Sequence, residues 1–345
     1  MRVLSGVQSS GKLHLGNYLG ALKQHVELQA EHDCFYFIAN YHALTTVQNA
    51  EELRQKTVDV ALDYLALGLD PNRTALYRQT DLPEVCELSW ILSCVTGKGL
   101  LERAVSYKDK VERGLAASMG LFCYPVLQAA DILIVSADFV PVGKDQVQHI
   151  EMTQDIAGYF NNTFCGGEEL LKRPEARLNQ AMVVPGIDGQ KMSKSYGNAI
   201  ELFDTPKATR KRIMSIVTDS TPVEAPKDPT QCNVFAILSL MASEEELAEW
   251  DRRYRAGGMG YGDAKQRVYE LFEDIFGPAR ERREQLARDL DYVEDVLVSG
   301  AAKAQRIAEP LMDKVRTACG LATARLAPSY RLARRAVLPI KEPGI

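Results

Sequence analysis

The first third of the chain alternates between short apolar runs and longer stretches in which apolar residues recur at helical spacing. The runs at 2–7, 34–39 and 74–79 predict strands, because each is short, continuous and bounded by turn residues. Residues 16–30 and 51–67 repeat their apolar positions at the helical period. This alternation predicts an α/β fold with a Rossmann-type parallel sheet that helices cover on both faces.

A helical insertion interrupts the alternation before the sheet is complete. Residues 83–117 and 121–135 have helical character, whereas 138–142 predicts another strand and 145–160 the helix that follows it. After about residue 195 only helical patterns remain, separated by Gly and Pro, which predicts an all-α C-terminal domain. We therefore expect four segments: a Rossmann-type domain at 1–188 with its helical insertion at about 80–120, a helical domain at 189–295, a C-terminal helix at 296–322 that packs back on the first domain, and a basic tail at 323–345.

Composition narrows the class of protein only slightly. A 345-residue chain with 46% hydrophobic and 25% charged residues is typical of globular proteins, and the net charge of −5 argues against a generally basic nucleic-acid binder. The N-terminus lacks the features of a signal peptide and no apolar run has membrane-spanning length, so we expect a cytoplasmic protein without a membrane partner. The seven cysteines include no CxxC pair, so we expect reduced thiols and no protein-held metal.

The segment KLHLGN at 12–17 follows a Gly/Ser turn and opens a helix. Such a turn directs free backbone N–H groups and the positive end of the helix toward one point, where an anion is stabilised. Gly16 would allow a nucleotide close to the backbone, and His14 and Asn17 would add hydrogen-bond donors. Taken alone, the segment is explained equally well by an ordinary turn with an N-cap.

The segment KMSKS at 191–195 carries two lysines and two serines in a loop flanked by glycines. Lys191 and Lys194 are flexible point charges suited to polyphosphate, although a loop of this composition alone is more often a solvated surface loop. KLHLGN and KMSKS together favour ATP-dependent adenylyl transfer, with Lys110 as a third lysine that can reach phosphate. The chain has no GxxxxGK[ST] and no GxSxG, which excludes P-loop chemistry and a serine-hydrolase elbow.

Two further segments predict the walls of a cleft. The loop PVGKDQ at 141–146 follows a strand, so it should face KLHLGN across the carboxyl edge of the sheet, where Asp145 either accepts from a ribose or caps the next helix. On a helix, Tyr124, Gln128 and Asp131 share one face. Asp131 is then either a solvated surface carboxylate or the floor of a pocket that accepts a ligand N–H or O–H.

These segments resemble the bacterial tryptophanyl-tRNA synthetases, which are class I aminoacyl-tRNA synthetases. The resemblance runs from Val3 to about Leu321. It rests on SGVQSSGKLHLGNYLGAL, which is similar to the HIGH region with Asn17 in the fourth position, and on YPVLQAADIL, PVGKDQVQHIEM, KMSKSYGN and GAAKAQRIAEPLMDKVRTACGL. It implies a HUP-like nucleotidyl-transfer domain and a homodimer assembled through the helical insertion.

The resemblance also implies a set of site residues. The expected catalytic residues are His14, Asn17, Lys110, Lys191 and Lys194. The lysines among them would stabilise the charge of the phosphates, and Mg²⁺ would arrive with ATP. The residues expected to bind ATP are Gln8, Ser9, Ser10, Gly16, Asn17, Gly143, Lys144, Asp145, Val184 (through its backbone), Lys191, Met192, Ser193, Lys194 and Ser195. The residues expected to bind tryptophan are Leu4, His42, Tyr124, Gln128, Asp131 (accepting the indole N–H), Val140, Val142 and Gln146.

The expected activity has two steps: tryptophan is activated by ATP to tryptophanyl-adenylate and pyrophosphate, and is then transferred to tRNA(Trp). Leu4 stands where relatives often have an aromatic residue and Gln128 where Met is common, which predicts a divergent or auxiliary enzyme that tolerates ring-substituted tryptophan. A basic run is either part of a tRNA-binding surface or a solvated helix face; it contains Lys207, Arg210, Lys211 and Arg212. Two alternatives remain: a tyrosyl-tRNA synthetase, and a catalytically silent synthetase-like regulatory binder.

Overall fold

The fold is built on one parallel sheet of five strands. The computed structural model describes residues 1–7, 12–104, 118–178 and 184–322. The strands are β1 (Arg2–Val7), β2 (Asp33–Ile38), β3 (Ala75–Arg78), β4 (Phe139–Val142) and β5 (Glu175–Leu178), in the spatial order β3-β2-β1-β4-β5. The four strands expected from the apolar runs are confirmed. The edge strand β5 was not expected, because EARL is short, charged and mostly solvent-accessible.

Alternate residues of β2 explain why the sheet is buried on both faces. Tyr36 and Ile38 belong to one hydrophobic core with residues of α4 (Ala50–Ala66), whereas Phe35 and Phe37 belong to a second core on the opposite face. A strand sends successive side chains to opposite sides, so a continuous apolar run fills both cores. The expected parallel sheet with helices on both faces is therefore what the structure shows.

The helix that follows β1 is interrupted. It begins as α1 (Leu15–Asn17), passes through a π-helical turn η1 (Tyr18–Leu22) and continues as α2 (Lys23–Leu28), where the sequence predicted one regular helix. His14 caps its start: the Asn17 N–H donates to His14 Nδ1 and the His14 N–H donates to the Asn17 side-chain oxygen. A π-helical turn frequently marks a functional site, and this one stands directly after the KLHLGN segment.

The expected insertion is helical in the residues that the structure describes. Short helix α3 (Asn40–Ala43) follows β2, and a 3₁₀ turn η2 (Gln79–Asp81) follows β3. The insertion contains α5 (Glu84–Ser93) and α6 (Lys98–Glu102), and α8 (Met119–Ile134) leads to β4. A 3₁₀ turn η3 (Lys144–Gln146) and the helix α9 (Val147–Phe164) connect β4 to β5.

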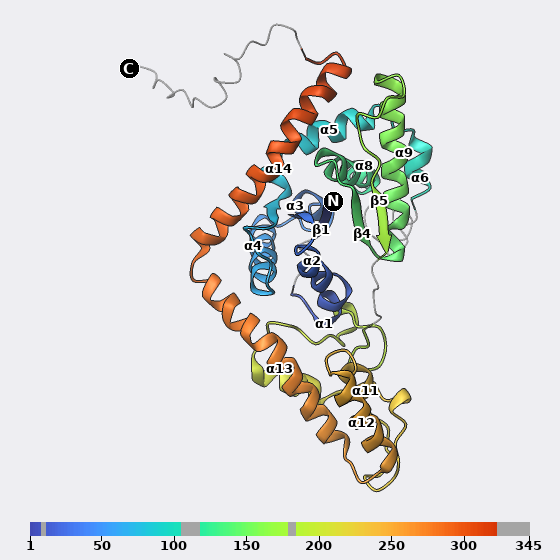
Figure 1. Ribbon diagram of the computed structural model, residues 1–345, viewed down its shortest axis with the longest axis vertical. Coiled ribbons are helices and arrows are strands. Elements are labelled where there is room, and N and C mark those ends of the chain that lie inside the picture. Colours follow the sequence, from blue (N-terminus) through green and yellow to red (C-terminus); the bar gives the residue numbers. More distant parts are fainter. Residues whose placement is uncertain (8–11, 105–117, 179–183, 323–345) are drawn as a thin grey trace.

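The C-terminal part is helical, as expected. It comprises the turn η4 (Lys194–Tyr196), α10 (Pro206–Met214), the turn η5 (Pro229–Gln231), α11 (Asn233–Leu238), α12 (Glu244–Ala256), α13 (Tyr261–Leu286) and α14 (Leu290–Ala318). In Figure 1, α11 and α12 form the end farthest from the sheet, and α14 runs back along the side of the sheet domain. The predicted boundary at 295–296 falls inside α14, and the predicted tail at 323–345 lies outside the described residues.

Helix α14 contacts β3 at backbone distance. An ideal Cβ on Gly300 would lie 1.9 Å from the Leu76 carbonyl oxygen, so only glycine fits there. One turn later, Lys303 donates to the carbonyl oxygens of Pro71 at 2.6 Å and Thr74 at 3.0 Å, in the loop that leads into β3. These contacts fix the C-terminal helix against the edge strand of the sheet.

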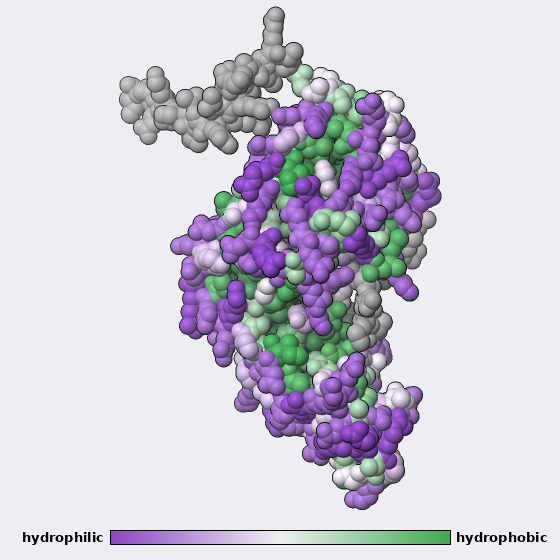
Figure 2. Space-filling view, viewed as in Figure 1, coloured by the Kyte–Doolittle hydropathy of each residue, from purple (hydrophilic) through white to green (hydrophobic). Residues whose placement is uncertain are grey.

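Hydrophilic residues dominate the lower helical end of the face shown in Figure 2, while apolar residues are visible near α5 and in the middle of the molecule. Large apolar side chains are exposed on the helices of the insertion, where Trp90 and Met119 are each 71% exposed. Among the described helices, none is both long and apolar enough to cross a membrane.

Candidate active site

Two adjoining cavities open at the carboxyl edge of the sheet. The inner cavity has a volume of about 230 Å³ and the outer cavity about 550 Å³. The two cavities share five of their lining residues: Ser5, Gly6, Gln128, Val140 and Gln146. These come from β1, β4 and the elements beside them, where the strand order reverses, which is the position at which open α/β sheets bind ligands.

The outer cavity brings together two segments that the sequence predicted to face each other. KLHLGN contributes Leu13, Gly16 and Asn17, and the PVGKDQ loop contributes Gly143 and Asp145. The sides of this cavity are therefore the start of a helix and the turn after β4, as the prediction required. Val142 lines this outer cavity rather than the inner one, and Lys144 is on neither wall.

His14 is neutral at physiological pH. Its side chain is buried, and burial together with the charge of Lys194 lowers its pKa to about 4. Because Nδ1 accepts from the Asn17 backbone N–H at 3.3 Å, the proton of the neutral ring belongs on Nε2. His14 thus offers an N–H donor without a positive charge.

Backbone pairing holds the segment that follows KMSKS against the start of the helix. The Leu15 N–H donates to the Ile200 carbonyl at 2.9 Å, and the Leu202 N–H donates to the Leu13 carbonyl at 3.0 Å. Met192 is buried, and its Cβ lies 3.6 Å from the position of an ideal Cβ on Gly16. The two motifs that suggested adenylyl transfer therefore lie side by side.

The lysines of KMSKS are exposed and lie on neither cavity wall. Partial burial lowers the pKa of Lys194, and the carboxylates of Glu201 and Asp63 oppose that shift. Val184 is buried and accepts the Met192 N–H at 2.9 Å through its backbone carbonyl. Gln8, Ser9, Ser10 and Lys110 lie outside the described residues.

Asn198, the last residue of KMSKSYGN, shapes the KMSKS segment, although it was not among the predicted site residues. Its side-chain oxygen accepts the Ser193 N–H at 2.8 Å, and its amide donates to the Asp188 carboxylate at 2.8 Å. Arg212 supports the same loop by donating to the carbonyls of Gly197 and Ala199, so its guanidinium is not simply part of an exposed basic face. Asn198 and Arg212 thus hold the loop through hydrogen bonds to residues between 5 and 15 positions away in the sequence.

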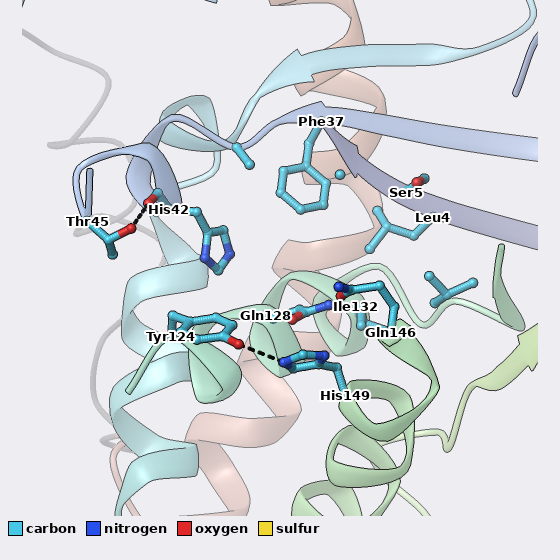
Figure 3. Close-up of a pocket in the computed structure, with 13 residues that line it drawn as sticks. Leu4, Ser5, Phe37, His42, Thr45, Tyr124, Gln128, Ile132, Gln146 and His149 are labelled. Carbon is cyan, nitrogen blue, oxygen red and sulfur yellow. Dashed lines mark hydrogen bonds between the residues drawn. The ribbon is translucent and has the colours of Figure 1, made fainter. Parts of the chain in front are cut away.

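The inner cavity has an apolar side and a polar side, as Figure 3 shows. Leu4 and Phe37 face the cavity from β1 and β2, and both are buried. Opposite them, the Tyr124 hydroxyl and His149 Nε2 are 2.7 Å apart and hydrogen-bonded. His42 enters from α3. Leu4, His42, Tyr124, Gln128, Val140 and Gln146 were predicted to line such a pocket, and they do. Phe37 and His149 also line it, although neither was predicted to be a site residue.

Asp131 lies behind the wall of the inner cavity, not on it. Its side chain is 2% exposed, and its Oδ2 lies 2.8 Å from Nε2 of His42, which does line the cavity. Gln79 donates to both carboxylate oxygens, at 2.8 and 2.9 Å. Burial raises the pKa of Asp131, whereas His42 and Gln79 favour its charged form. The reading of Asp131 as a solvated surface carboxylate is therefore wrong.

Known proteins resemble the chain along nearly its whole length. A family profile described as tRNA synthetases class I (W and Y) matches residues 1–277. A tryptophan–tRNA ligase of Rhodopirellula baltica is 51% identical, over 93% of this chain and 100% of the relative. A second, from Fusobacterium nucleatum, is 50% identical over 93% of this chain and 98% of its own length.

A solved structure agrees with these relatives in both fold and sequence. Campylobacter jejuni tryptophanyl-tRNA synthetase, complexed with ADP and tryptophan, superposes with a TM-score of 0.89 at 49% identity, and covers 93% of this chain and 100% of that one. The site described above combines a parallel sheet, the neighbouring KLHLGN and KMSKS segments and two adjoining cavities. The chain belongs to the class I tRNA synthetases (W and Y), among the tryptophan–tRNA ligases.

Proposed function

We propose that this enzyme activates L-tryptophan with ATP and transfers it to tRNA(Trp). The observation that carries the proposal is the shared wall of the inner and outer cavities. An amino acid in the inner cavity and a nucleotide in the outer one would meet at Gln128, Val140 and Gln146. Two substrates held in adjoining cavities react as an effectively unimolecular pair.

The first step joins the two substrates without a protein nucleophile. A tryptophan carboxylate oxygen forms a bond to the α-phosphorus of ATP, and the bond to the bridging oxygen breaks as pyrophosphate leaves. In the second step a ribose hydroxyl at the tRNA terminus attacks the acyl carbon, and AMP leaves with the bonding electrons. Catalysis then consists of positioning and of stabilising the phosphate charge.

The phosphates would be held by the start of the KLHLGN helix and by three lysines. Nε2 of His14 would donate to a phosphate oxygen without adding charge, with Gly16 and Asn17 beside it. Lys191 and Lys194 of KMSKS would supply positive charge, with Lys110 assisting. Mg²⁺ bound to ATP would neutralise further phosphate charge as part of the substrate.

The remaining nucleotide contacts are proposed on the resemblance and on the lining of the outer cavity. Gly143 and Asp145 line that cavity and would hold the ribose with Lys144. Val184 would hold the adenine through its backbone. Other ATP contacts that we propose are Gln8, Ser9, Ser10, Met192, Ser193 and Ser195.

The amino acid would lie with its indole against the apolar side of the inner cavity. Leu4 and Val140 would pack on the ring, and Tyr124 and Gln146 would bind the ammonium and carboxylate groups. Asp131 is the proposed acceptor for the indole N–H, together with His42 in front of it. Val142, on the outer cavity, would contact the reacting end of the substrate instead of the ring.

Two macromolecular partners belong to the proposal. Exposed Trp90 and Met119 support a homodimer formed through the helical insertion, because a large apolar side chain exposed on a helix is typical of a protein interface. Lys207, Arg210 and Lys211 are exposed and support contact of α10 with tRNA.

Pyrophosphate exchange tests the proposal directly. With ATP, Mg²⁺ and labelled pyrophosphate, we expect exchange that depends on tryptophan, and charging of a tRNA(Trp) transcript. Exchange that depends on tyrosine would identify a tyrosyl enzyme. Tryptophan binding without exchange would identify a regulatory binder.

A further inference from the structure

Gln79 connects three parts of the inner site, although neither its position in the sequence nor the cavity wall marks it as a site residue. It stands in η2, directly after β3, and is 1% exposed. Its Oε1 accepts the backbone N–H of Tyr41 at 3.0 Å and that of His42 at 3.4 Å. Its Nε2 donates to the Asp131 carboxylate. A buried side chain with every polar atom engaged is held in one orientation.

The contacts of Gln79 determine the direction of its amide. Backbone N–H groups only donate, so the atom that faces Tyr41 and His42 must be the oxygen. The amide nitrogen therefore faces Asp131, and it can only donate to the carboxylate. The backbone of α3 thus fixes Gln79 as a donor toward Asp131.

We infer that Gln79 is a positioning residue that holds Asp131 as a charged acceptor with one acceptor position left for a ligand donor. A carboxylate has about four acceptor positions. The described residues fill three: Gln79 donates once to each oxygen, and His42 lies on Oδ2. The remaining position is on Oδ1. Because Asp131 is 2% exposed and lies behind the cavity wall, an indole N–H would have to enter beside His42 to occupy that position.

The charges around Asp131 make this donor important. Among the described residues, Asp131 interacts with His42 on α3, Tyr77 on β3 and Cys86 on α5, and Tyr124 and His149 line the same cavity. A proton on Asp131 would turn the acceptor into a donor. Hydrogen bonds to the charged form of a buried carboxyl oppose its protonation. Without the Gln79 donor, we expect Asp131 to take up a proton more readily and to bind an indole N–H less well.

The test uses two Gln79 variants and one matched control, and it rests on the proposed tryptophan activation. Gln79→Leu removes the donor, and Gln79→Glu keeps the shape but replaces the donor with a carboxylate. The control is Gln55→Glu. This exposed glutamine on α4 also donates to an aspartate, Asp59, at 3.4 Å, but it lies on neither cavity wall. Exchange kinetics would give the KM values for tryptophan and ATP between pH 6 and 8.5, and a melting temperature would be measured for each protein.

We expect Gln79→Leu to raise the tryptophan KM by roughly 10- to 100-fold, the usual effect of losing a hydrogen bond to a charged group. The ATP KM should remain within about twofold, and Gln55→Glu should match the parent protein. Preference for tryptophan over the analogue with sulfur in place of the indole N–H should narrow, because the acceptor that distinguishes them is weakened.

Gln79→Glu provides a pH signature that a purely structural role would not produce. At pH 8 the introduced carboxylate repels Asp131, so the tryptophan KM should be high. Toward pH 6 it gains a proton, can donate again, and the KM should fall, whereas in the parent protein acidification works against the Asp131 acceptor. This test compares the tryptophan KM of the same Gln79→Glu protein at two pH values. It therefore remains valid even if Gln79→Leu fails to fold.

Three results would overturn the inference: a tryptophan KM within threefold of the parent in both variants, an equal rise in the ATP KM, or no recovery of Gln79→Glu at low pH. Failure of the proposed function would look different, because the parent protein itself would then show no tryptophan-dependent exchange.

Discussion

Replacing Gly300 with alanine tests whether the close contact between α14 and β3 sets the stability of the sheet domain. An ideal Cβ would lie 1.9 Å from the Leu76 carbonyl oxygen, 2.6 Å from its carbonyl carbon and 2.8 Å from its nitrogen. All three atoms are backbone, so none can rotate away as a side chain would. Helix and strand would have to separate by roughly 1 Å to reach even a tight contact.

The separation has a cost because other contacts bind α14 to the same strand. Arg78, at the end of β3, donates to both carboxylate oxygens of Glu294 at 2.6 and 2.8 Å, and Lys303 donates to carbonyls in the loop before β3. Overpacking a well-packed contact typically costs about 1–3 kcal/mol. For a chain of this size we expect the melting temperature to fall by roughly 1–4 °C.

Gly262→Ala is the matched control. Gly262 also lies in a helix, near the start of α13, but an added Cβ there meets no atom within 4 Å. Alanine favours a helix over glycine by up to about 1 kcal/mol, so this variant should be unchanged or slightly more stable. Thermal unfolding followed by circular dichroism would compare the two. Equal melting temperatures for the Gly300 and Gly262 variants would refute the argument from close approach.

Three further predictions concern the site. Lys194→Ala should slow exchange by about 100-fold with little change in tryptophan affinity, because its charge acts on phosphate; equal loss of tryptophan binding by calorimetry would contradict this. Histidine in an unfolded chain titrates near 6.5 and His14 near 4, so the unfolded chain binds more protons in that window, and the unfolding free energy should fall as the pH is lowered through it. His14→Gln should reduce this fall by roughly 1–3 kcal/mol in urea titrations at pH 7.5 and 4.5, and identical pH dependence would count against the buried neutral ring. Gln128→Met should lower exchange with hydroxylated tryptophans relative to tryptophan by about 2- to 10-fold, the effect of one neutral hydrogen bond, and an unchanged ratio would argue against a Gln128 contact with the ring.

The parts of the fold that could be predicted from the sequence are those with a regular apolar period. β2 was predictable because its alternate residues fill two cores, and α4 because its apolar face repeats over 17 residues. The strand β5 could not be predicted, because four residues at a sheet edge, two charged and two apolar, are too few to establish a strand period. Nor could the π-helical turn at Tyr18–Leu22, since its apolar pattern is compatible with a regular helix.

The site, like the fold, has residues that the sequence predicts and residues that it does not. KLHLGN and KMSKS were recognisable because phosphate chemistry requires particular residue types at short spacing. Gln79 was not, because it acts through hydrogen bonds to backbone atoms and to a residue distant in the sequence. A glutamine after a strand is common, and only the fold distinguishes this one.

The contacts around KLHLGN and KMSKS also limit how far the two motifs would have to move when ATP binds. Pairing of Leu15 with Ile200 and of Leu13 with Leu202 is made by the backbone, so KLHLGN lies against the segment that directly follows KMSKS. Buried Met192 and the Asn198 contact hold the start of the loop. Lys191 and Lys194 are exposed, and the nearest acids that influence Lys194 are Glu201 and Asp63. Because buried and backbone contacts hold the rest of the segment, we expect ATP to reposition these lysine side chains more than the two motifs themselves.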